Sequence, residues 1–349
     1  MSIFKNPLAK LNLATALHGL AGGFFITHVS LILNKNSILL AATFNAIYAL
    51  GSALSKVPRR IKQSNVNKLT LLLRILIFLL ASLASSHWFL TLILLLALIL
   101  ASMSRRQFID LKQEVGGLDV KTLTGHGSFN AIGYGIGAAL SALFLNTQSL
   151  LYALALLFFI LSFIFYPVSS EIKIINKSLG LSKRDVAVAV LFTASIAPLG
   201  NAVCLLVFSK IYGDKIAGLT VFAYTLGSLL SQLVADKIRE KGRPIAKSVF
   251  TTSLFLLISL LVHQEILLIT LRFLTGSLLY AAQGLLEERT HKNTESERGL
   301  DYLWSIFSLT SFTLLLILPT LGERFGFIYL PVYSIALSLL IASLKKIMP

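Results

Sequence analysis

Residues 48–55 read YALGSALS and residues 224–231 read YTLGSLLS, so six of eight positions are identical at an offset of 176 residues. The offset is close to half the length of the 349-residue chain. Each copy ends an apolar stretch and runs into a basic loop, at Lys56–Lys62 in the first half and at Lys237–Lys247 in the second. This match in sequence and context indicates that the chain contains two related halves.

The composition is that of a membrane protein. Hydrophobic residues make up 56% of the chain and charged residues only 13%, with a mean hydropathy of +0.81, whereas about a quarter of a soluble domain is charged. Twelve apolar stretches bounded by charged or turn residues are long enough to be transmembrane helices, at about 20 residues per span. They leave only short connections, which excludes a soluble catalytic domain. The expected spans are 11–33, 37–55, 68–86, 88–104, 126–146, 149–167, 185–210, 215–235, 247–263, 265–284, 300–321 and 326–344.

The positions of the basic residues predict the orientation. If the N-terminus and the loops after even-numbered spans share one side, that side holds 25 of the 31 lysines and arginines. The other side holds four, and Arg74 and Arg272 fall inside spans. Cytoplasmic loops carry the excess of basic residues, so we expect a multi-pass protein of the cell (cytoplasmic) membrane with both termini in the cytoplasm. The same distribution explains the net charge of +16 without a nucleic-acid partner.

The chain resembles the major facilitator superfamily of secondary transporters in three features. It has two sets of six spans, both of its ends are expected inside the cell, and a basic loop follows the second span of each half. The loop of the second half is similar to the Gly, Asp, Gly-Arg pattern of that family, although Gln232 stands where a glycine is expected. The loop of the first half keeps the basic residues but has no Asp. The resemblance implies a gating role for these loop residues: Arg59, Arg60, Asp236, Arg239 and Arg243.

The resemblance also implies the architecture and the mechanism. We expect an all-α fold of twelve transmembrane helices in two parallel six-helix bundles, residues 1–167 and 185–349, joined by a cytoplasmic linker at 168–184. Because each half has an even number of spans, the two halves enter the membrane from the same side and in the same direction. Tyr48 should therefore superpose onto Tyr224. The family transports small solutes by rocking the two bundles about a central site. The alternative is a non-transporting protein of this fold, acting as a receptor, an assembly factor or a lipid scramblase.

Helix-breaking residues occur at corresponding positions of the first span of each half. Gly22-Gly23 lies in the first half, and Pro198 with Gly200 lies in the second, with Pro198 at the 176-residue offset from Gly22. Paired interruptions of this kind indicate a transporter's binding site, because freed backbone groups need protein or a cavity to face. The competing interpretation is that glycine and proline are frequent in membrane helices in general.

Polar side chains inside the apolar spans predict a cavity between the halves near mid-membrane, where such groups turn toward protein or water. His18 is favoured as a packing residue, and the alternative is a titrating site. For the tyrosines, bonding to their own bundle is at least as well supported as a cavity role. Arg272 shares a helical face with Glu265. Its favoured interpretation is snorkelling or structural pairing, and the alternative is a clamp for a substrate carboxylate or phosphate. The candidate substrate-binding residues are His18, Asn45, Tyr48, Asn130, Asn201, Tyr224 and Arg272.

All 15 carboxylates fall in loops or at span ends. The chain therefore has no obvious carboxylate for proton coupling, and either it is a facilitator or His18 couples transport to protons. The apolar lining without a core carboxylate favours a neutral, hydrophobic or anionic solute over a cation. A stripe of small residues at Gly133, Gly137 and Ser141 is expected to pack between the bundles.

No enzymatic role is expected, since no catalytic signature is present. Cys204 is the one cysteine, which excludes an intrachain disulfide and a cysteine-based metal cluster. Glu287, Glu288 and His291 have a helical spacing that could hold a metal, but a solvated helix end is the favoured interpretation. We expect no metal and no cofactor, and a protein that acts as a monomer in the lipid bilayer.

Overall fold

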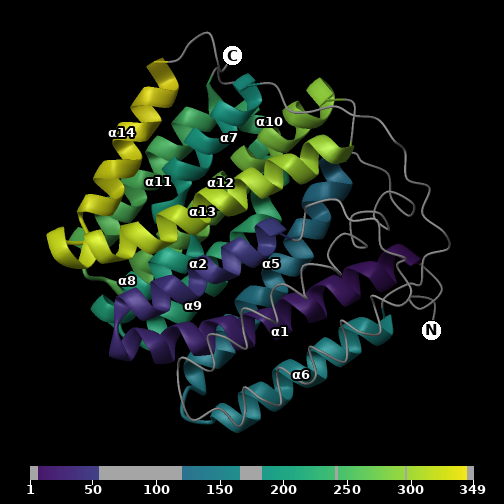
Figure 1. Ribbon diagram of the computed structural model, residues 1–349, viewed down its shortest axis with the longest axis vertical. Helices are drawn as coiled ribbons and strands as arrows, with labels where there is room; N and C mark the ends of the chain where they lie inside the picture. Colours follow the sequence, from purple (N-terminus) through teal and green to yellow (C-terminus); the bar gives the residue numbers. More distant parts are fainter. Residues whose placement is uncertain (1–6, 55–119, 166–182, 240–242, 295–296, 344–349) are drawn as a thin grey trace.

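The computed structural model describes residues 7–54, 120–165, 183–239, 243–294 and 297–343, which form helices and short connections without a β-strand (Figure 1). The expected spans 68–86 and 88–104, the residues Arg59, Arg60 and Arg74, and most of the expected linker lie outside these ranges. The helices are α1 (Pro7–Asn36), α2 (Ile38–Leu54), α5 (Val120–Leu143), α6 (Gln148–Phe165), α7 (Lys183–Ile196), η2 (Ala197–Leu199), α8 (Asn201–Tyr212), α9 (Asp214–Gly227), η3 (Ser228–Leu230), α10 (Ser231–Arg239), α11 (Pro244–Leu261), α12 (Glu265–Thr294), α13 (Glu297–Phe325) and α14 (Tyr329–Ser343).

The expected spans within the described residues are confirmed as helices. Two of them are each divided by a 3-10 turn: the span expected at 185–210 is α7, η2 and α8, and the span expected at 215–235 is α9, η3 and α10. Counting each of these as one segment, six of the described helices are long and apolar enough to cross a membrane. Helices suit this environment because they satisfy their backbone hydrogen bonds within one segment.

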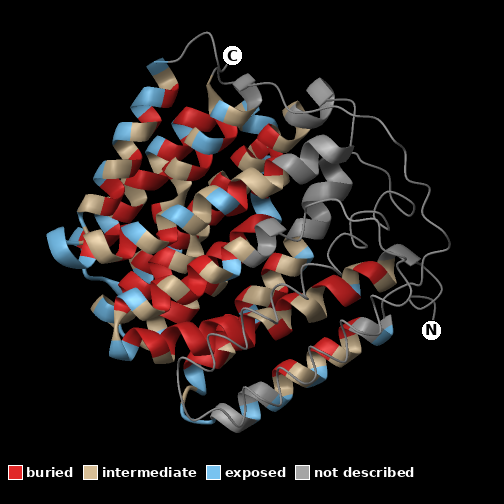
Figure 2. Cartoon of the chain, viewed as in Figure 1, coloured by how far each residue is buried: buried red, intermediate tan, exposed pale blue. Residues whose placement is uncertain are grey.

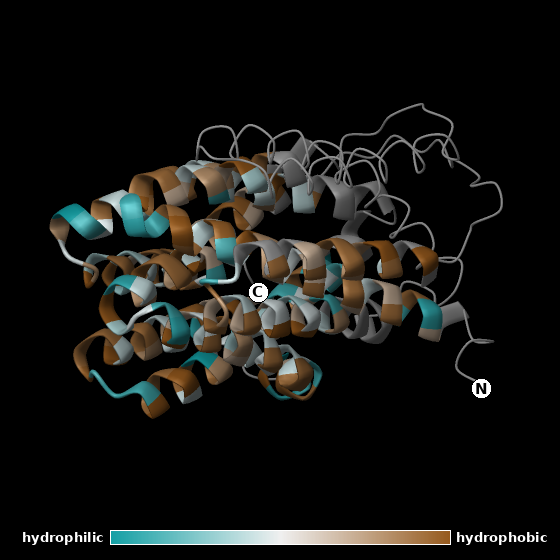
Figure 3. Ribbon diagram, turned by 90° about the horizontal axis from the view of Figure 1, so that it is seen from below, coloured by the Kyte–Doolittle hydropathy of each residue, from teal (hydrophilic) through white to brown (hydrophobic). Residues whose placement is uncertain are grey.

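The outer surface of the helices is apolar. Large side chains such as Ile164, Leu233 and Ile266 are 64–82% exposed, and the burial pattern alternates between protein-facing and exposed positions along the helices (Figure 2). Apolar residues cover most of the helical surface, and the hydrophilic residues at the left of the view lie at helix ends (Figure 3). This surface suits acyl chains, and the chain is a polytopic membrane protein.

α1 and α5 pack so closely that the contact requires glycine. A Cβ atom at Gly19 or Gly23 would collide with the backbone of α5, and one at Gly133 or Gly137 would collide with the backbone of α1. α1 itself is an uninterrupted helix of 30 residues. The expected break at Gly22 and Gly23 is therefore wrong, because the glycine permits close helix approach instead of bending the chain.

The two halves meet mainly along two helix pairs, α2 with α13 and α5 with α9. A Cβ atom at Gly135 on α5 would collide with the Thr225 hydroxyl on α9. Nearby, the Ser128 hydroxyl donates to the Ser228 carbonyl over 3.2 Å. The expected stripe is thus corrected: Gly133 and Gly137 pack within the first half, and Gly135 between them packs against the second.

Helices α9 and α12 of the second half make a similarly close contact. A Cβ atom at Gly227 would collide with the Phe273 carbonyl, and one at Gly276 would collide with the Tyr224 carbonyl. The adjoining core contains fully buried side chains from α7 and α8, among them Phe192. This packing fixes the position of Tyr224 relative to α12, where Arg272 lies.

A neighbouring pair of glycines tests the close contact between α1 and α5. Gly23→Ala should lower the free energy of unfolding by about 1–3 kcal/mol, as overpacking does, because the new methyl group meets the Tyr134 carbonyl. Gly22→Ala is the matched control, since its methyl group would lie 3.9 Å from the nearest Tyr134 carbon and alanine favours the helix by up to about 1 kcal/mol. Thermal unfolding of the purified variants in detergent measures both. Equal melting temperatures would contradict the packing described.

Candidate functional site

The first span of the second half is broken where the sequence predicts it. Pro198 is buried in the 3-10 turn η2, and Gly200 has extended backbone angles of φ −71° and ψ 163° before α8 begins. Proline lacks a backbone donor and the extended residue interrupts the ladder, so carbonyl groups at the end of η2 need partners outside the helix. The predicted interruption at Pro198 and Gly200 is confirmed.

Arg272 on α12 supplies one of these partners. Its Nη1 donates to the Leu199 carbonyl over 2.7 Å, and its Nη2 donates to Asn201 Oδ1 over 3.0 Å. The residue is 2% exposed, and its buried Nε has no hydrogen-bond partner within the described part of the chain. Snorkelling is therefore wrong as an interpretation. The structural pairing that was its companion is found, but with Leu199 and Asn201 and not with Glu265, which is exposed at the start of α12. The guanidinium is turned into the protein, toward the helix break.

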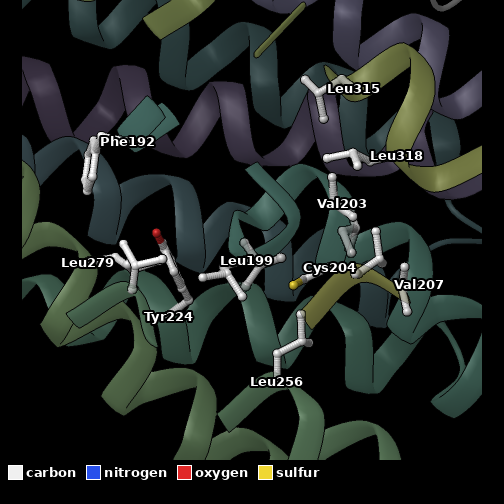
Figure 4. Close-up of a cluster of buried hydrophobic side chains, with 14 of the residues drawn as sticks. Phe192, Leu199, Val203, Cys204, Val207, Tyr224, Leu256, Leu279, Leu315 and Leu318 are labelled. Carbon is white, nitrogen blue, oxygen red and sulfur yellow. The ribbon is translucent and has the colours of Figure 1, made fainter. Parts of the chain in front are cut away.

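Aromatic side chains surround the Arg272 guanidinium. Its Cζ lies 4.6 Å from the centroid of the Tyr224 ring and 5.8 Å from that of Phe208, both within the range of a cation–π interaction. The Tyr280 ring is tilted against Tyr224, with centroids 5.4 Å apart. We call Leu199, Asn201, Tyr224, Arg272 and Tyr280 the Arg272 cluster. Leu199 and Tyr224 lie in the same buried region as Cys204 (Figure 4).

Tyr280 was not among the residues expected from the sequence. It follows Arg272 by eight residues and Gly276 by four, so all three share one face of α12. The sequence therefore contained a signal for Tyr280: it lies on the same helical face as an arginine inside an apolar span. Cys204, whose thiol donates to the Pro198 carbonyl over 3.4 Å, was noted only for its lack of a disulfide partner.

The first half approaches the cluster through Tyr134 on α5. Tyr134 packs, like Tyr280, against the buried cluster that contains Tyr224. Tyr48 itself is 36% exposed. Tyrosines from α5, α9 and α12 therefore share one region of the core, to which both halves contribute.

Other candidate residues of the first half have different surroundings. The His18 ring packs against Phe159 on α6, with centroids 5.8 Å apart. Asn45 is buried and its Nδ2 donates to Ser30 Oγ over 3.0 Å and to a carbonyl of its own helix. Asn130 lies where α5 crosses α1, with its carbonyl against Gly19. The structure therefore brings together Asn201, Tyr224 and Arg272, and it places His18 and Asn45 in helix-packing positions.

One end of the second half carries the expected gating residues. Arg239, at the end of α10, forms an ion pair with Glu288 on α12, with Nη2 and Oε2 2.5 Å apart. Asp236 is exposed, and Arg243 has a left-handed φ of 63° directly before α11. Glu287 accepts a hydrogen bond from Gln283. Both carboxylates of the Glu287-Glu288 pair thus have protein partners on or beside α12, which continues to Thr294.

The opposite end holds polar contacts between the halves. Asn34 on α1 donates through Nδ2 to the Leu206 carbonyl on α8 over 3.0 Å. Lys35 forms an ion pair with Asp214 at the start of α9, 3.5 Å apart, and Asp214 also accepts a hydrogen bond from Ser209 over 2.5 Å. We call this group the Lys35 latch. It ties the C-terminal end of α1 to the second half.

Comparison with known proteins identifies the fold. No protein-family model matches the sequence, and no curated protein matches it. Among solved structures, a mutant of the nucleoside transporter NupG is 12% identical, with 97% of this chain and 99% of that chain covered and a TM-score of 0.71. A POT family transporter in complex with a thioalcohol-conjugated peptide is 12% identical over 100% of both chains, with a TM-score of 0.69. The chain therefore has the fold of these two transporters, which agrees with the fold expected from the sequence.

Removing the Arg272 cluster's polar groups should change the stability of the protein by little. In the double variant Arg272→Met, Asn201→Leu the Leu199 carbonyl loses its donor, which costs about 1–3 kcal/mol. The removal of a buried charge offsets that cost, so the free energy of unfolding should change by less than about 2 kcal/mol. Arg239→Met is the control: its side chain is 51% exposed, and its loss should cost less than about 1 kcal/mol. Melting temperatures in detergent report both. A loss of several kcal/mol in the double variant would show that the cluster serves stability.

Proposed function

We propose that this protein is a transporter that moves a small solute across the cell membrane by alternating access between its two six-helix bundles. The observation that carries the proposal is the irregular backbone of η2 and Gly200 within an apolar span, beside a buried polar cluster. Irregular backbone at membrane depth is tolerated where it is buried in protein or lines a site. Transporters place substrate sites at such interrupted helices near the interface of their halves.

The orientation follows from the basic residues. With both termini in the cytoplasm, the Arg239–Glu288 pair faces the cytoplasm and the Lys35 latch faces outward. The latch joins α1 to α8 and α9, so this conformation corresponds to a carrier that is closed on the outside. Opening the outer end requires Asn34 and Lys35 to separate from Leu206 and Asp214, while the Arg239–Glu288 region belongs to the cytoplasmic gate.

The proposed site is the Arg272 cluster together with Tyr134 and Tyr48. Its aromatic rings and its single cation suit a neutral, hydrophobic or anionic solute and disfavour organic cations. The neighbours in fold include a nucleoside transporter and a transporter solved with a peptide conjugate. A small organic solute is the corresponding proposal for this chain.

Transport is proposed to be facilitative. The carboxylates of the sequence lie in loops and at helix ends, and His18 packs against Phe159 on α6. Among the described residues, neither a carboxylate nor His18 therefore belongs to the Arg272 cluster. A monomer is sufficient for this mechanism, because both halves of the site come from one chain.

The single cysteine offers a direct test of alternating access. Cys204 is 1% exposed, so a membrane-impermeant maleimide added outside sealed vesicles reaches it only when the outer end opens. Lys35→Asp replaces the ion pair with Asp214 by two like charges. Labelling should become about three- to tenfold faster, equivalent to roughly 0.7–1.4 kcal/mol. The rate is followed by mass shift on gels, with Cys204→Ser as the blank.

Lys215→Asp is the matched control, since it makes the same charge change one residue from Asp214 at an exposed position. Its labelling rate should remain near that of the unmodified protein. Equal acceleration by both variants would reject the latch. Complete protection of Cys204 in every variant would favour a non-transporting protein with fixed halves.

A further inference from the structure

The charge of Arg272 has no counter-charge among the residues that the structure describes. Among the residues that the structure describes, no carboxylate pairs with it, and the ion pairs of Lys35 and Arg239 lie at opposite ends of the helices. Its two hydrogen-bond acceptors, the Leu199 carbonyl and the Asn201 amide oxygen, are neutral. A cation that is 2% exposed within a membrane span is costly unless it is paired.

Capping the helix break does not by itself explain an arginine. The Leu199 carbonyl needs one donor, and a neutral hydroxyl or amide supplies one without burying a charge. Arg272 brings a planar fork with five N–H donors, of which the Nε–H has no partner in the described helices. The excess of donors and the uncompensated charge both point to a ligand that accepts hydrogen bonds and is negatively charged.

The surroundings define the shape of the ligand group. The Tyr224 ring covers one face of the guanidinium at 4.6 Å, so a ligand approaches the edge of the fork, where Nε lies. Asn201 turns its Oδ1 toward Arg272, which leaves its Nδ2 donors for the ligand. A planar carboxylate fits such an edge with two parallel hydrogen bonds, and its single charge matches the single cation.

We propose, on the basis of the transport function above, that the substrate is a monoanionic organic acid whose carboxylate binds the Nε edge of Arg272 and the amide of Asn201. Its apolar or aromatic body lies against Tyr224 and Tyr280. Leu199 and Asn201 hold the fork in place, so the helix break positions the charge that recognises the substrate.

Matched probes of different charge test this proposal on the purified full-length protein. Benzoate should raise the melting temperature in a concentration-dependent way, whereas benzamide and benzylamine, at equal concentration, should shift it much less. Asn201→Asp keeps an acceptor for Arg272 but supplies the missing negative charge from the protein. This variant should melt at or above the temperature of the unmodified protein, and its Kd for benzoate should rise about tenfold or more, equivalent to about 1.4 kcal/mol.

Gln264→Glu is the matched control, because it makes the same amide-to-acid change at an exposed position. It should bind benzoate as the unmodified protein does. Arg272→Gln provides a second test that adds no charge, and it should abolish the preference for benzoate over benzamide. Equal stabilisation by benzoate and benzamide, or an unchanged Kd in Asn201→Asp, would overturn the proposal.

The binding assay is independent of transport. If Cys204 shows alternating exposure but benzoate is not preferred, the inferred substrate class is wrong and the transport function stands. If benzoate binding depends on Asn201 and Arg272 but Cys204 is never exposed to the outside, the anion site is supported and the transport function is rejected.

Discussion

Backbone hydrogen bonding in lipid is the constraint on which the rest of this structure depends. Every carbonyl within the bilayer needs a donor from the protein, and the span from α7 to α8 breaks that ladder at Pro198 and Gly200. Arg272 resolves the defect by donating to Leu199. Because arginine carries a charge as well as hydrogen-bond donors, its use at the helix break places a cation among aromatic rings. The fold thereby acquires a chemically distinctive group in an otherwise apolar interior.

Small residues determine where that group lies. Glycines at the contacts of α1 with α5, of α5 with α9 and of α9 with α12 bring backbones together, so that tyrosines from both halves reach the same region. At one end of the helices the Lys35 latch joins the two halves by polar contacts, and at the opposite end the Arg239–Glu288 pair joins α10 to α12 within the second half. Movement of the two halves against each other would therefore break the Lys35 latch and leave the Arg239–Glu288 pair intact.

Much of the fold could be predicted from the sequence, and the site only in part. Apolar length and loop charge predict spans well, because lipid imposes one condition on every segment. The break at Pro198 was predictable because proline cannot donate. The continuity of α1 through Gly22 was not predictable. Glycine permits both a bend in a helix and the close approach of a second helix, and the sequence does not show which helix faces it. Arg272 was placed in its span, but its direction depended on partners 71 and 73 residues away.

We propose above that the counter-charge of Arg272 arrives with the substrate. In an experimental structure determined in the presence of benzoate, density for the carboxylate should then appear with one oxygen within about 2.7–3.2 Å of Arg272 Nε and with the ring against Tyr224 or Tyr280. An Asp or Glu side chain of the protein paired with Arg272, or benzoate bound elsewhere with the guanidinium unoccupied, would contradict it.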